Sequence, residues 1–365
     1  MTESVPIRVG FIGLGVMART HLRDILMRAD TEVVAVCEPS SVAFETAADL
    51  FNQQGLPLPP NEQDWRRFVA VHAARLDAVV IITPHVLHFA QAAACLEAGL
   101  DVLIEKPMVM TAHEAQALIE TRDRTGRLLV VAFQGSLSPH VREASRMLRS
   151  GRLGSILNIS AVVWQNWSTL TMGTWRHDPQ QSGGGFLFDT GAHMLNTVSD
   201  LAGEDFAQVA AWLENEDRPV DVRAVIMGRL ASGALVTMNA CGSAIPSCHS
   251  DVRVFTTKAI VRTGIWGEVL ELQRTGSSRL RKVRSVAPTP VWDQFLNVRS
   301  GRSVNPSPPE VGLRMARLWD AIRESSSHGG AVIALPASAP HATTLPPGSA
   351  SLGHGAPSLT KEIGS

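Results

Sequence analysis

The sequence predicts an α/β fold with two domains, the first built on a doubly wound parallel sheet and the second on a mostly antiparallel sheet. Strand-like and helix-like segments alternate as far as residue 136, whereas strand-like runs follow one another beyond residue 150. Alternation is typical of parallel sheets, and succession is typical of antiparallel ones. The 365 residues, 45% hydrophobic and 18% charged, are enough to bury two sizeable cores.

A glycine-rich turn joins the first predicted strand, residues 7–12, to a helix predicted over residues 19–27. Gly13 permits a tight turn, and Gly15 lets a pyrophosphate approach the N–H groups at the helix N-terminus. Ala18 is small enough for the helix to pack on the strand, which completes a G-x-G-x-x-A spacing. We therefore predict a Rossmann domain over residues 1–136, with cofactor contacts from Gly13, Leu14, Gly15, Val16 and Met17.

An acidic residue follows the second predicted strand, residues 32–37, about twenty positions after the glycines. There the carboxylate of Glu38 can accept hydrogen bonds from both ribose hydroxyls and repel a 2′-phosphate. The sequence thus favours NAD over NADP. NADP stays open, because Ser40 and Ser41 can hydrogen-bond a phosphate, although no arginine follows directly.

A lysine stands at the carboxyl end of a later strand. The β-branched run 77–83 ends at Thr83 and Pro84, and the strand 101–104 is followed by Glu105, Lys106 and Pro107. Open α/β sheets hold ligands at this edge, where burial and a cationic nicotinamide favour a lysine that exchanges protons. From the residues alone, Lys106 is either a catalytic group or a surface lysine near a loop. We also expect the cofactor site to include Thr83, Pro84, His88 and Glu105.

The first domain is expected to close with a helix and a strand. Thr111 and Glu114 have the spacing of a capping box for a helix through Glu120, and residues 127–133 form the next strand. Gln134 follows that strand, where its amide can bond the nicotinamide carboxamide or simply face solvent.

The second domain is predicted over residues 137–335. It starts with an amphipathic helix over 141–148, and a late helix over 310–325 is expected to pack back near the first domain. Strands are predicted at 155–164, 209–213, 222–230, 234–238 and 252–256. Residues 336–365 have no periodicity and are expected to be a disordered tail without chemistry.

Composition limits the class of partner. The net charge is −1 and there is no basic block with interleaved aromatic residues, so neither nucleic acid nor an anionic membrane is expected as a partner. No leader and no run of about eighteen apolar residues is present, which predicts a soluble cytoplasmic protein. The four cysteines are expected to be reduced, and the spacing of Cys241, Cys248 and His249 is poor for zinc, so we predict no metal.

Three glycines at 183–185 precede a second group of polar residues. If the following stretch is helical, Asp189 and His193 lie one turn apart, so the carboxylate can orient the imidazole. The alternative is a capping aspartate and a core histidine. Trp175 and Arg176 precede the glycines; an aromatic face suits the apolar side of a sugar ring, but tryptophan is also an ordinary core residue.

These motifs occur in a specific order. The runs 9–15, 83–88, 105–107 and 183–193, taken together, resemble the glucose-fructose oxidoreductase, inositol dehydrogenase and rhizopine-catabolism (Gfo/Idh/MocA) family over residues 6–335. The resemblance implies a Rossmann domain followed by an α/β domain with a large open sheet, use of NAD or NADP, and a homodimer or homotetramer. It also implies oxidation or reduction of a secondary carbinol in a sugar or a cyclitol.

The resemblance assigns roles to single residues. Lys106 and His193 would contact the reacting hydroxyl and share proton transfer, with Asp189 as the third catalytic residue. The substrate site would comprise Lys106, Trp175, Arg176, Asp189 and His193.

Two departures from the family pattern affect the substrate prediction. Asn196 replaces an aspartate often found three residues after the histidine, and residues 135–137 replace a basic residue or tyrosine. The chain contains no tyrosine, which excludes a Tyr-Lys dehydrogenase mechanism. Two alternatives stay open: a redox-neutral NAD-dependent glycosidase, and a non-catalytic NAD-binding ligand sensor. The presence of Lys106, Asp189 and His193 argues against the sensor.

Overall fold

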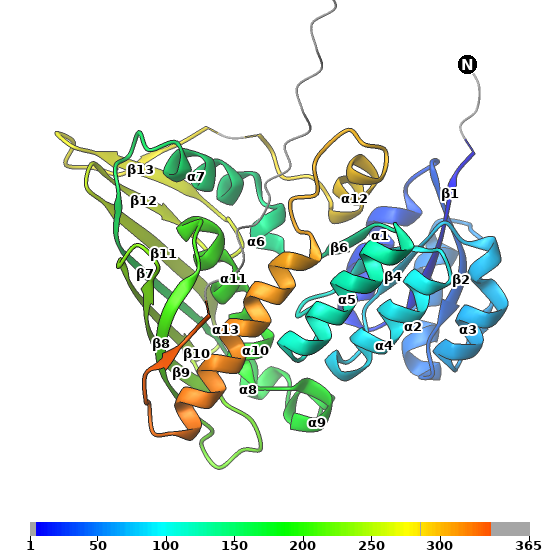
Figure 1. Ribbon diagram of the computed structural model, residues 1–365. Coiled ribbons are helices and arrows are strands. Elements are labelled where there is room, and N and C mark those ends of the chain that lie inside the picture. The colour runs from blue at the N-terminus through cyan, green and yellow to red at the C-terminus, as the bar shows by residue number, and fades with distance from the viewer. Residues whose placement is uncertain (1–4, 285, 337–365) are drawn as a thin grey trace, which may run out of the picture. The chain divides into compact units, whose positions relative to one another are not determined.

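Two β-sheets organise the protein, as the computed structural model, which describes residues 5–284 and 286–336, shows in Figure 1. A six-stranded sheet has the order β3-β2-β1-β4-β5-β6, and a nine-stranded sheet has the order β14-β13-β12-β11-β7-β10-β9-β8-β15. The predicted fold class is confirmed. The boundary at residue 136 stays a prediction, and the predicted tail lies outside the described residues apart from Pro336.

The first sheet is parallel throughout and is doubly wound. Its strands are β1 (Ile7–Ile12), β2 (Thr31–Cys37), β3 (Asn61–Glu62), β4 (Ala78–Ile81), β5 (Asp101–Ile104) and β6 (Leu129–Val131). Strands β4 and β5 are buried at every position, as expected for strands covered on both faces. The strand order reverses between β1 and β4, and this switch point is where such sheets bind ligands.

Helices cover both faces of this sheet (Figure 1): α1 (Val16–Leu26), α2 (Ser41–Gln53), α3 (Trp65–His72), α4 (His85–Glu97) and α5 (Ala112–Thr125). The capping box forms, since the Thr111 hydroxyl accepts from the Glu114 N–H and the Glu114 carboxylate accepts from the Thr111 N–H. Helix α5 runs five residues beyond the predicted end and stops at Gly126, whose φ of 64° favours glycine.

The second sheet is antiparallel except where β7 and β10 pair in parallel. Its strands are β7 (Ile156–Gln165), β8 (Phe206–Glu214), β9 (Arg223–Leu230), β10 (Leu235–Cys241), β11 (Cys248–Thr256), β12 (Ala259–Thr263), β13 (Leu270–Arg274), β14 (Arg281–Lys282) and β15 (Ile333–Ala334). Helices α7 (Pro139–Arg149), α11 (Gly191–Ala202) and α13 (Pro309–Ser327) pack on one face, as Figure 1 shows. On β9, Ala224 and Ile226 are buried whereas Val225 and Met227 are exposed, so the opposite face is open.

The chain returns to the first domain after the second sheet. Helix α12 (Val291–Arg299), which the sequence analysis missed, packs in the core of the first domain. The Trp292 indole donates to the Thr31 hydroxyl at 3.0 Å and stacks on Phe295 at 4.8 Å between centroids. Helix α13 then lies against α5, where Arg122 pairs with Glu310. No helix in the described part of the chain is both long and apolar enough to span a bilayer.

Candidate active site

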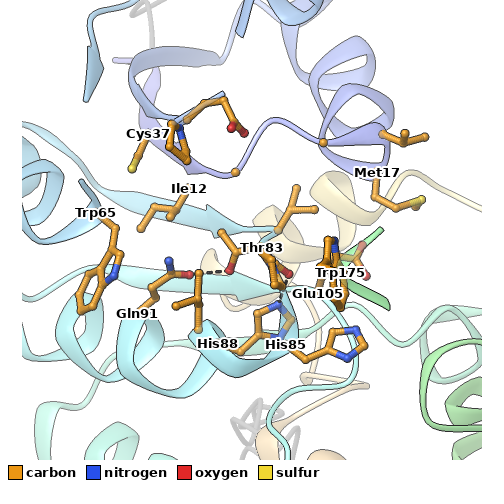
Figure 2. Close-up of a pocket in the computed structure, with 18 of the residues that line it drawn as sticks. Ile12, Met17, Cys37, Trp65, Thr83, His85, His88, Gln91, Glu105 and Trp175 are labelled. Carbon is orange, nitrogen blue, oxygen red and sulfur yellow. Dashed lines mark hydrogen bonds between the residues drawn. The ribbon is translucent and has the colours of Figure 1, made fainter. Parts of the chain in front are cut away.

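A cavity of about 390 Å³ opens at the carboxyl ends of β1, β4 and β5, at the switch point of the first sheet. Figure 2 shows Trp65 and Cys37 toward one end of it, and Trp175 and Glu105 toward the other. Thirteen of the residues predicted for the site line this cavity: Gly13, Gly15, Val16, Met17, Glu38, Thr83, Pro84, His88, Glu105, Lys106, Trp175, Arg176 and Asp189. Leu14, Gln134 and His193 are outside the lining.

The glycine turn before the N-terminus of α1 has the geometry predicted for a pyrophosphate-binding turn. Gly13 has a φ of 91°, and a Cβ at this position would lie 2.2 Å from the Ile82 carbonyl oxygen, so only glycine is accommodated. At Gly15 a Cβ would meet no atom within 4 Å, which leaves open space for a ligand beside the helix N-terminus.

Glu38 is buried at the end of β2 and fixed by two backbone donors. One carboxylate oxygen accepts from the Leu14 N–H at 2.7 Å, and the other accepts from the Ser40 N–H at 2.8 Å. A carboxylate has about four lone-pair sites, so two are left for ribose hydroxyls. The Ser40 hydroxyl oxygen accepts from the Ala43 N–H and caps α2, which leaves its O–H available to donate.

Glu105 is held in place by His21, a contact that the sequence analysis did not identify. His21 of α1 lies 2.9 Å from one Glu105 carboxylate oxygen, and the other accepts from the Lys106 N–H. Burial by itself would raise the pKa of Glu105, but His21 and Lys106 hold it below its ordinary value. His88 connects the same loops, because its ring nitrogens lie 2.8 and 3.0 Å from the carbonyl oxygens of Pro107 and Thr83.

Lys106 is paired with Asp189 across the two domains. Its ammonium donates to the Asp189 carboxylate at 3.0 Å and to the Asp189 carbonyl at 2.9 Å. The two side chains are only 15% and 8% exposed, which rules out a free surface lysine. The other carboxylate oxygen accepts from the Trp167 indole at 2.8 Å and from Arg176 Nε at 2.9 Å. Burial by itself would raise the pKa of Asp189, but Lys106 and Arg176 hold it well below its usual range.

A second buried carboxylate positions Asp189. Asp221 accepts from the N–H groups of Gly185 and Leu187, at 2.7 and 2.9 Å, and so caps the short helix α10 (Phe186–Asp189). A Cβ at Gly185 would lie 1.9 Å from the Asp221 carbonyl oxygen. This close approach explains one of the three glycines. Burial raises the pKa of the Asp221 carboxyl.

The predicted relay between Asp189 and His193 is not formed. The helical stretch divides at Thr190 into α10 and α11, and the Asp189 carboxylate is engaged by Lys106, Trp167 and Arg176 instead. His193 Nδ1 is buried without a hydrogen-bond partner among the described residues. Burial and the neighbouring Lys106 lower the pKa of His193 to about 3, so its imidazole is neutral near pH 7.

Three further polar residues have defined positions. His85 is buried, and its Nδ1 lies 2.7 Å from the Ser182 carbonyl oxygen. Gln134 is exposed and outside the cavity lining. Asn196, considered for its effect on the substrate, is buried away from the lining and donates to the Ser136 hydroxyl at 2.8 Å.

Trp175 and Arg176, from the second domain, form part of the cavity lining. They lie in the 3₁₀ turn η2 (Trp175–His177), where the Arg176 guanidinium is 4.5 Å from the centre of the Trp175 ring. Trp175 also contacts His85 edge to face at 4.7 Å. No group of three or more histidine, cysteine or acidic side chains arranged for a metal ion occurs within the described residues.

A glycine turn at a Rossmann switch point, with a buried lysine and aspartate at the far end of the cavity, defines a dinucleotide-binding α/β protein. Comparison with known proteins identifies its family. Residues 7–133 match the oxidoreductase family with an NAD-binding Rossmann fold, and residues 141–262 match the GFO/IDH/MocA C-terminal domain. The chain belongs to the Gfo/Idh/MocA family, as its motifs predicted.

Two curated relatives act on sugars according to their names. D-glucoside 3-dehydrogenase of Escherichia coli K12 is 28% identical over 204 residues, which is 56% of this chain and 56% of the relative. Levoglucosan dehydrogenase of Pseudarthrobacter phenanthrenivorans is 27% identical over 236 residues, 59% of this chain and 56% of the relative. The chain thus spans a little over half the length of these relatives.

The similarity to known proteins extends over more of the chain in structure than in sequence. A solved structure of levoglucosan dehydrogenase in complex with NADH and levoglucosan superposes with a TM-score of 0.77. The superposition covers 91% of this chain and all of the other, at 24% identity. This likeness establishes the two-domain architecture.

Proposed function

We propose that the protein is an NAD-dependent oxidoreductase that interconverts a secondary hydroxyl and a ketone on a sugar, a sugar derivative or a cyclitol. The observation that carries the proposal is the Lys106–Asp189 pair at one end of a cavity whose other parts include the glycine turn and Glu38. NAD, when bound, supplies a hydride acceptor at nicotinamide C4. Gly13, Gly15 and Glu38 would hold its pyrophosphate and ribose, and NADP is the less favoured cofactor.

Lys106 is arranged for proton transfer at a single position. Lys106 Nζ is tetrahedral and has four substituent positions. One is the bond to carbon, and two point at the Asp189 carbonyl and carboxylate. The remaining position is the one that can face a substrate oxygen. In the oxidation direction, Lys106 would act as the neutral amine, with its lone pair at this position, and Nζ would take the hydroxyl proton there. Bound NAD would supply the acceptor for the hydride of the carbinol carbon, and in the opposite direction the ammonium would return the proton to the ketone oxygen.

His193 assists as a neutral group in this mechanism. Its Nδ1 is enclosed and its pKa is lowered to about 3 by burial, so it does not carry a proton charge near pH 7. We therefore assign it a hydrogen bond to the reacting oxygen through Nε2. Lys106 performs the net proton transfer, and Asp189 keeps Lys106 in place. Trp175 and Arg176 are the proposed substrate contacts from the second domain.

The open face of the nine-stranded sheet is the proposed surface for a homodimer or homotetramer. It exposes Trp212, Val225, Met227 and Leu235, which lie on the neighbouring strands β8, β9 and β10. Apolar side chains gathered on one open sheet face favour association. The molar mass in solution, measured by light scattering, would be that of one chain if this proposal is wrong.

The first experiment follows absorbance at 340 nm with NAD and with NADP against inositols, free sugars, glycosides and sugar acids. Turnover of a ring substrate supports the oxidoreductase. NAD retained through turnover, with a glycosidic bond cleaved, would indicate the redox-neutral glycosidase. NAD binding without turnover of any compound would favour the sensor.

Replacement of the lysine tests the assignment directly. Lys106→Ala should leave the NAD dissociation constant within a few-fold and lower kcat by about a thousandfold or more, because proton transfer and the held geometry are both lost. Lys258→Ala, which removes an exposed lysine of the β11–β12 turn, is the matched control and should behave as wild type. Equal losses of NAD binding and turnover in Lys106→Ala would indicate a structural lysine.

A further inference from the structure

One half-buried tryptophan, Trp266, contacts His193 just outside the cavity lining and has no assigned role. Trp266 lies in the turn 264–268 between β12 and β13, and its ring contacts His193 edge to face with 6.0 Å between centroids. Other tryptophans, Trp167, Trp292 and Trp319, are at most 2% exposed and fill the core. The match to the family's C-terminal domain ends at residue 262, four positions before Trp266.

The first half of this turn is fixed by side chains from two elements. The Thr197 hydroxyl of α11 donates to the Ile265 carbonyl at 2.7 Å. The Ile265 N–H donates to the Ser250 hydroxyl of β11 at 3.0 Å. Both polar groups of Ile265 are therefore satisfied by neighbours that are themselves buried.

The second half of the turn is fixed as well. Glu268 accepts from the Trp266 N–H at 3.1 Å and from the Ser250 hydroxyl at 2.8 Å. His140 Nδ1, at the start of α7, lies 2.8 Å from the Gly267 carbonyl oxygen. A loop whose backbone is tied to three surrounding elements holds its one large side chain in a defined orientation, which is what a ligand contact requires.

The neighbours of His193 define where a substrate ring can lie. Phe133 contacts the His193 ring at 6.3 Å and is completely buried, so that direction is closed. Trp266 contacts the same ring but is partly accessible, and its indole N–H makes no hydrogen bond within the described residues. A ring whose hydroxyl reaches His193 and Lys106 thus has an aromatic surface beside it.

We propose that Trp266 is the platform on which the apolar face of a six-membered polyhydroxylated ring rests. This inference depends on the proposed function for the position of the reacting hydroxyl. A ring with equatorial hydroxyls presents a face of axial C–H groups, which suits the face of an indole. An axial hydroxyl on that face would lose its water without a partner. The substrate class is therefore a pyranoside or cyclitol with predominantly equatorial hydroxyls.

The test compares wild type, Trp266→Phe and Trp266→Ala with three probes. Methyl β-D-glucopyranoside and scyllo-inositol have equatorial hydroxyls, whereas D-chiro-inositol carries an axial hydroxyl on each face. Their dissociation constants are measured on NADH-loaded protein by the emission of the bound NADH, and kcat/KM is measured at 340 nm. The dissociation constant of NADH and Tm report any general damage.

We expect the Trp266→Ala variant to bind the two equatorial probes about 10- to 100-fold more weakly, with partial recovery in Trp266→Phe. D-chiro-inositol should bind weakly to all three proteins, and NADH affinity should be unchanged. Equal binding of the equatorial probes by wild type and Trp266→Ala would overturn the platform, as would failure of wild type to bind any probe. Trp266-dependent binding without turnover would instead overturn the oxidoreductase assignment and leave the platform standing.

Discussion

Replacement of Asp189 by asparagine should destabilise the protein markedly although the two side chains have the same shape. The carboxylate accepts from Lys106 on one oxygen and from Trp167 and Arg176 on the other. Asparagine has one acceptor and one donor group, so its NH₂ must face either the ammonium or two N–H donors. The substitution also removes the only negative charge that the Lys106 ammonium and the Arg176 guanidinium contact among the described residues.

The magnitude follows from burial. Loss of one partner from a buried ion pair costs about 3–5 kcal/mol, because the other charge stays desolvated. Lys106 and Arg176 are 15% and 30% exposed, so each can regain some water. We therefore expect the lower end, a loss of about 3 kcal/mol in the free energy of unfolding.

The assay is urea unfolding at pH 7.5, followed by circular dichroism and tryptophan fluorescence, with coincident transitions required for a two-state analysis. A double-mutant cycle with Lys106→Met should give a coupling of about 2 kcal/mol, since the two residues touch. Asp178→Asn is the control: this aspartate caps α9 (Pro179–Ser182) through the Gln180 N–H, and asparagine caps helices equally well. An Asp189→Asn variant as stable as Asp178→Asn, with no coupling, would refute the reasoning.

Two other predictions follow from the buried groups. Glu38→Ala should weaken the binding of NAD at least about tenfold and the binding of NADP much less, because the ribose acceptor is lost while repulsion of a 2′-phosphate also disappears. An unchanged ratio of the two dissociation constants would show that Glu38 is not part of the ribose site. Burial lowers the pKa of His85 to about 3 against about 6.5 in an unfolded chain, so the unfolded chain binds more protons between these values. The free energy of unfolding must therefore fall as the pH falls from 6.5 toward 3, and Tm should drop less between pH 7 and pH 4.5 in His85→Phe than in wild type. Parallel Tm curves for the two proteins would contradict this assignment.

Local signals allowed much of the first domain to be predicted. The turn at Gly13 depends on a positive φ and on the approach of the Ile82 carbonyl, and both requirements act on one residue. The capping box at Thr111 and Glu114 is likewise a contact three residues apart. Such features are visible in sequence because each restricts the residue type at one position or at two positions three residues apart.

Some of the elements that were missed have weak or absent local signals. Strands β14 and β15 contain two residues each and are defined only by pairing with a neighbour. Helix α12 is different, since Trp292, Phe295 and Leu296 have helical spacing and are buried. That apolar pattern was a signal that could have found it.

The error at Asp189 has a long-range cause. Spacing of four residues placed His193 on the same helical face, but the Asp189 carboxylate is engaged by other partners, and Asp221, 32 positions beyond Asp189, holds the N-terminus of the short helix that carries it. The partner that takes the carboxylate, Lys106, is 83 positions earlier in the chain. A pattern within one short segment cannot reveal contacts between residues so far apart in the sequence.

Asp189 contacts Lys106 through two groups, its backbone carbonyl and its carboxylate, and these two groups have different roles. Lys106 donates to the carbonyl of Asp189 as well as to its carboxylate, and an asparagine keeps that carbonyl. The position of the ammonium therefore survives the substitution in part, whereas its countercharge is lost. The Asp189 carbonyl thus helps to fix the position of the Lys106 ammonium, whereas the Asp189 carboxylate supplies its countercharge.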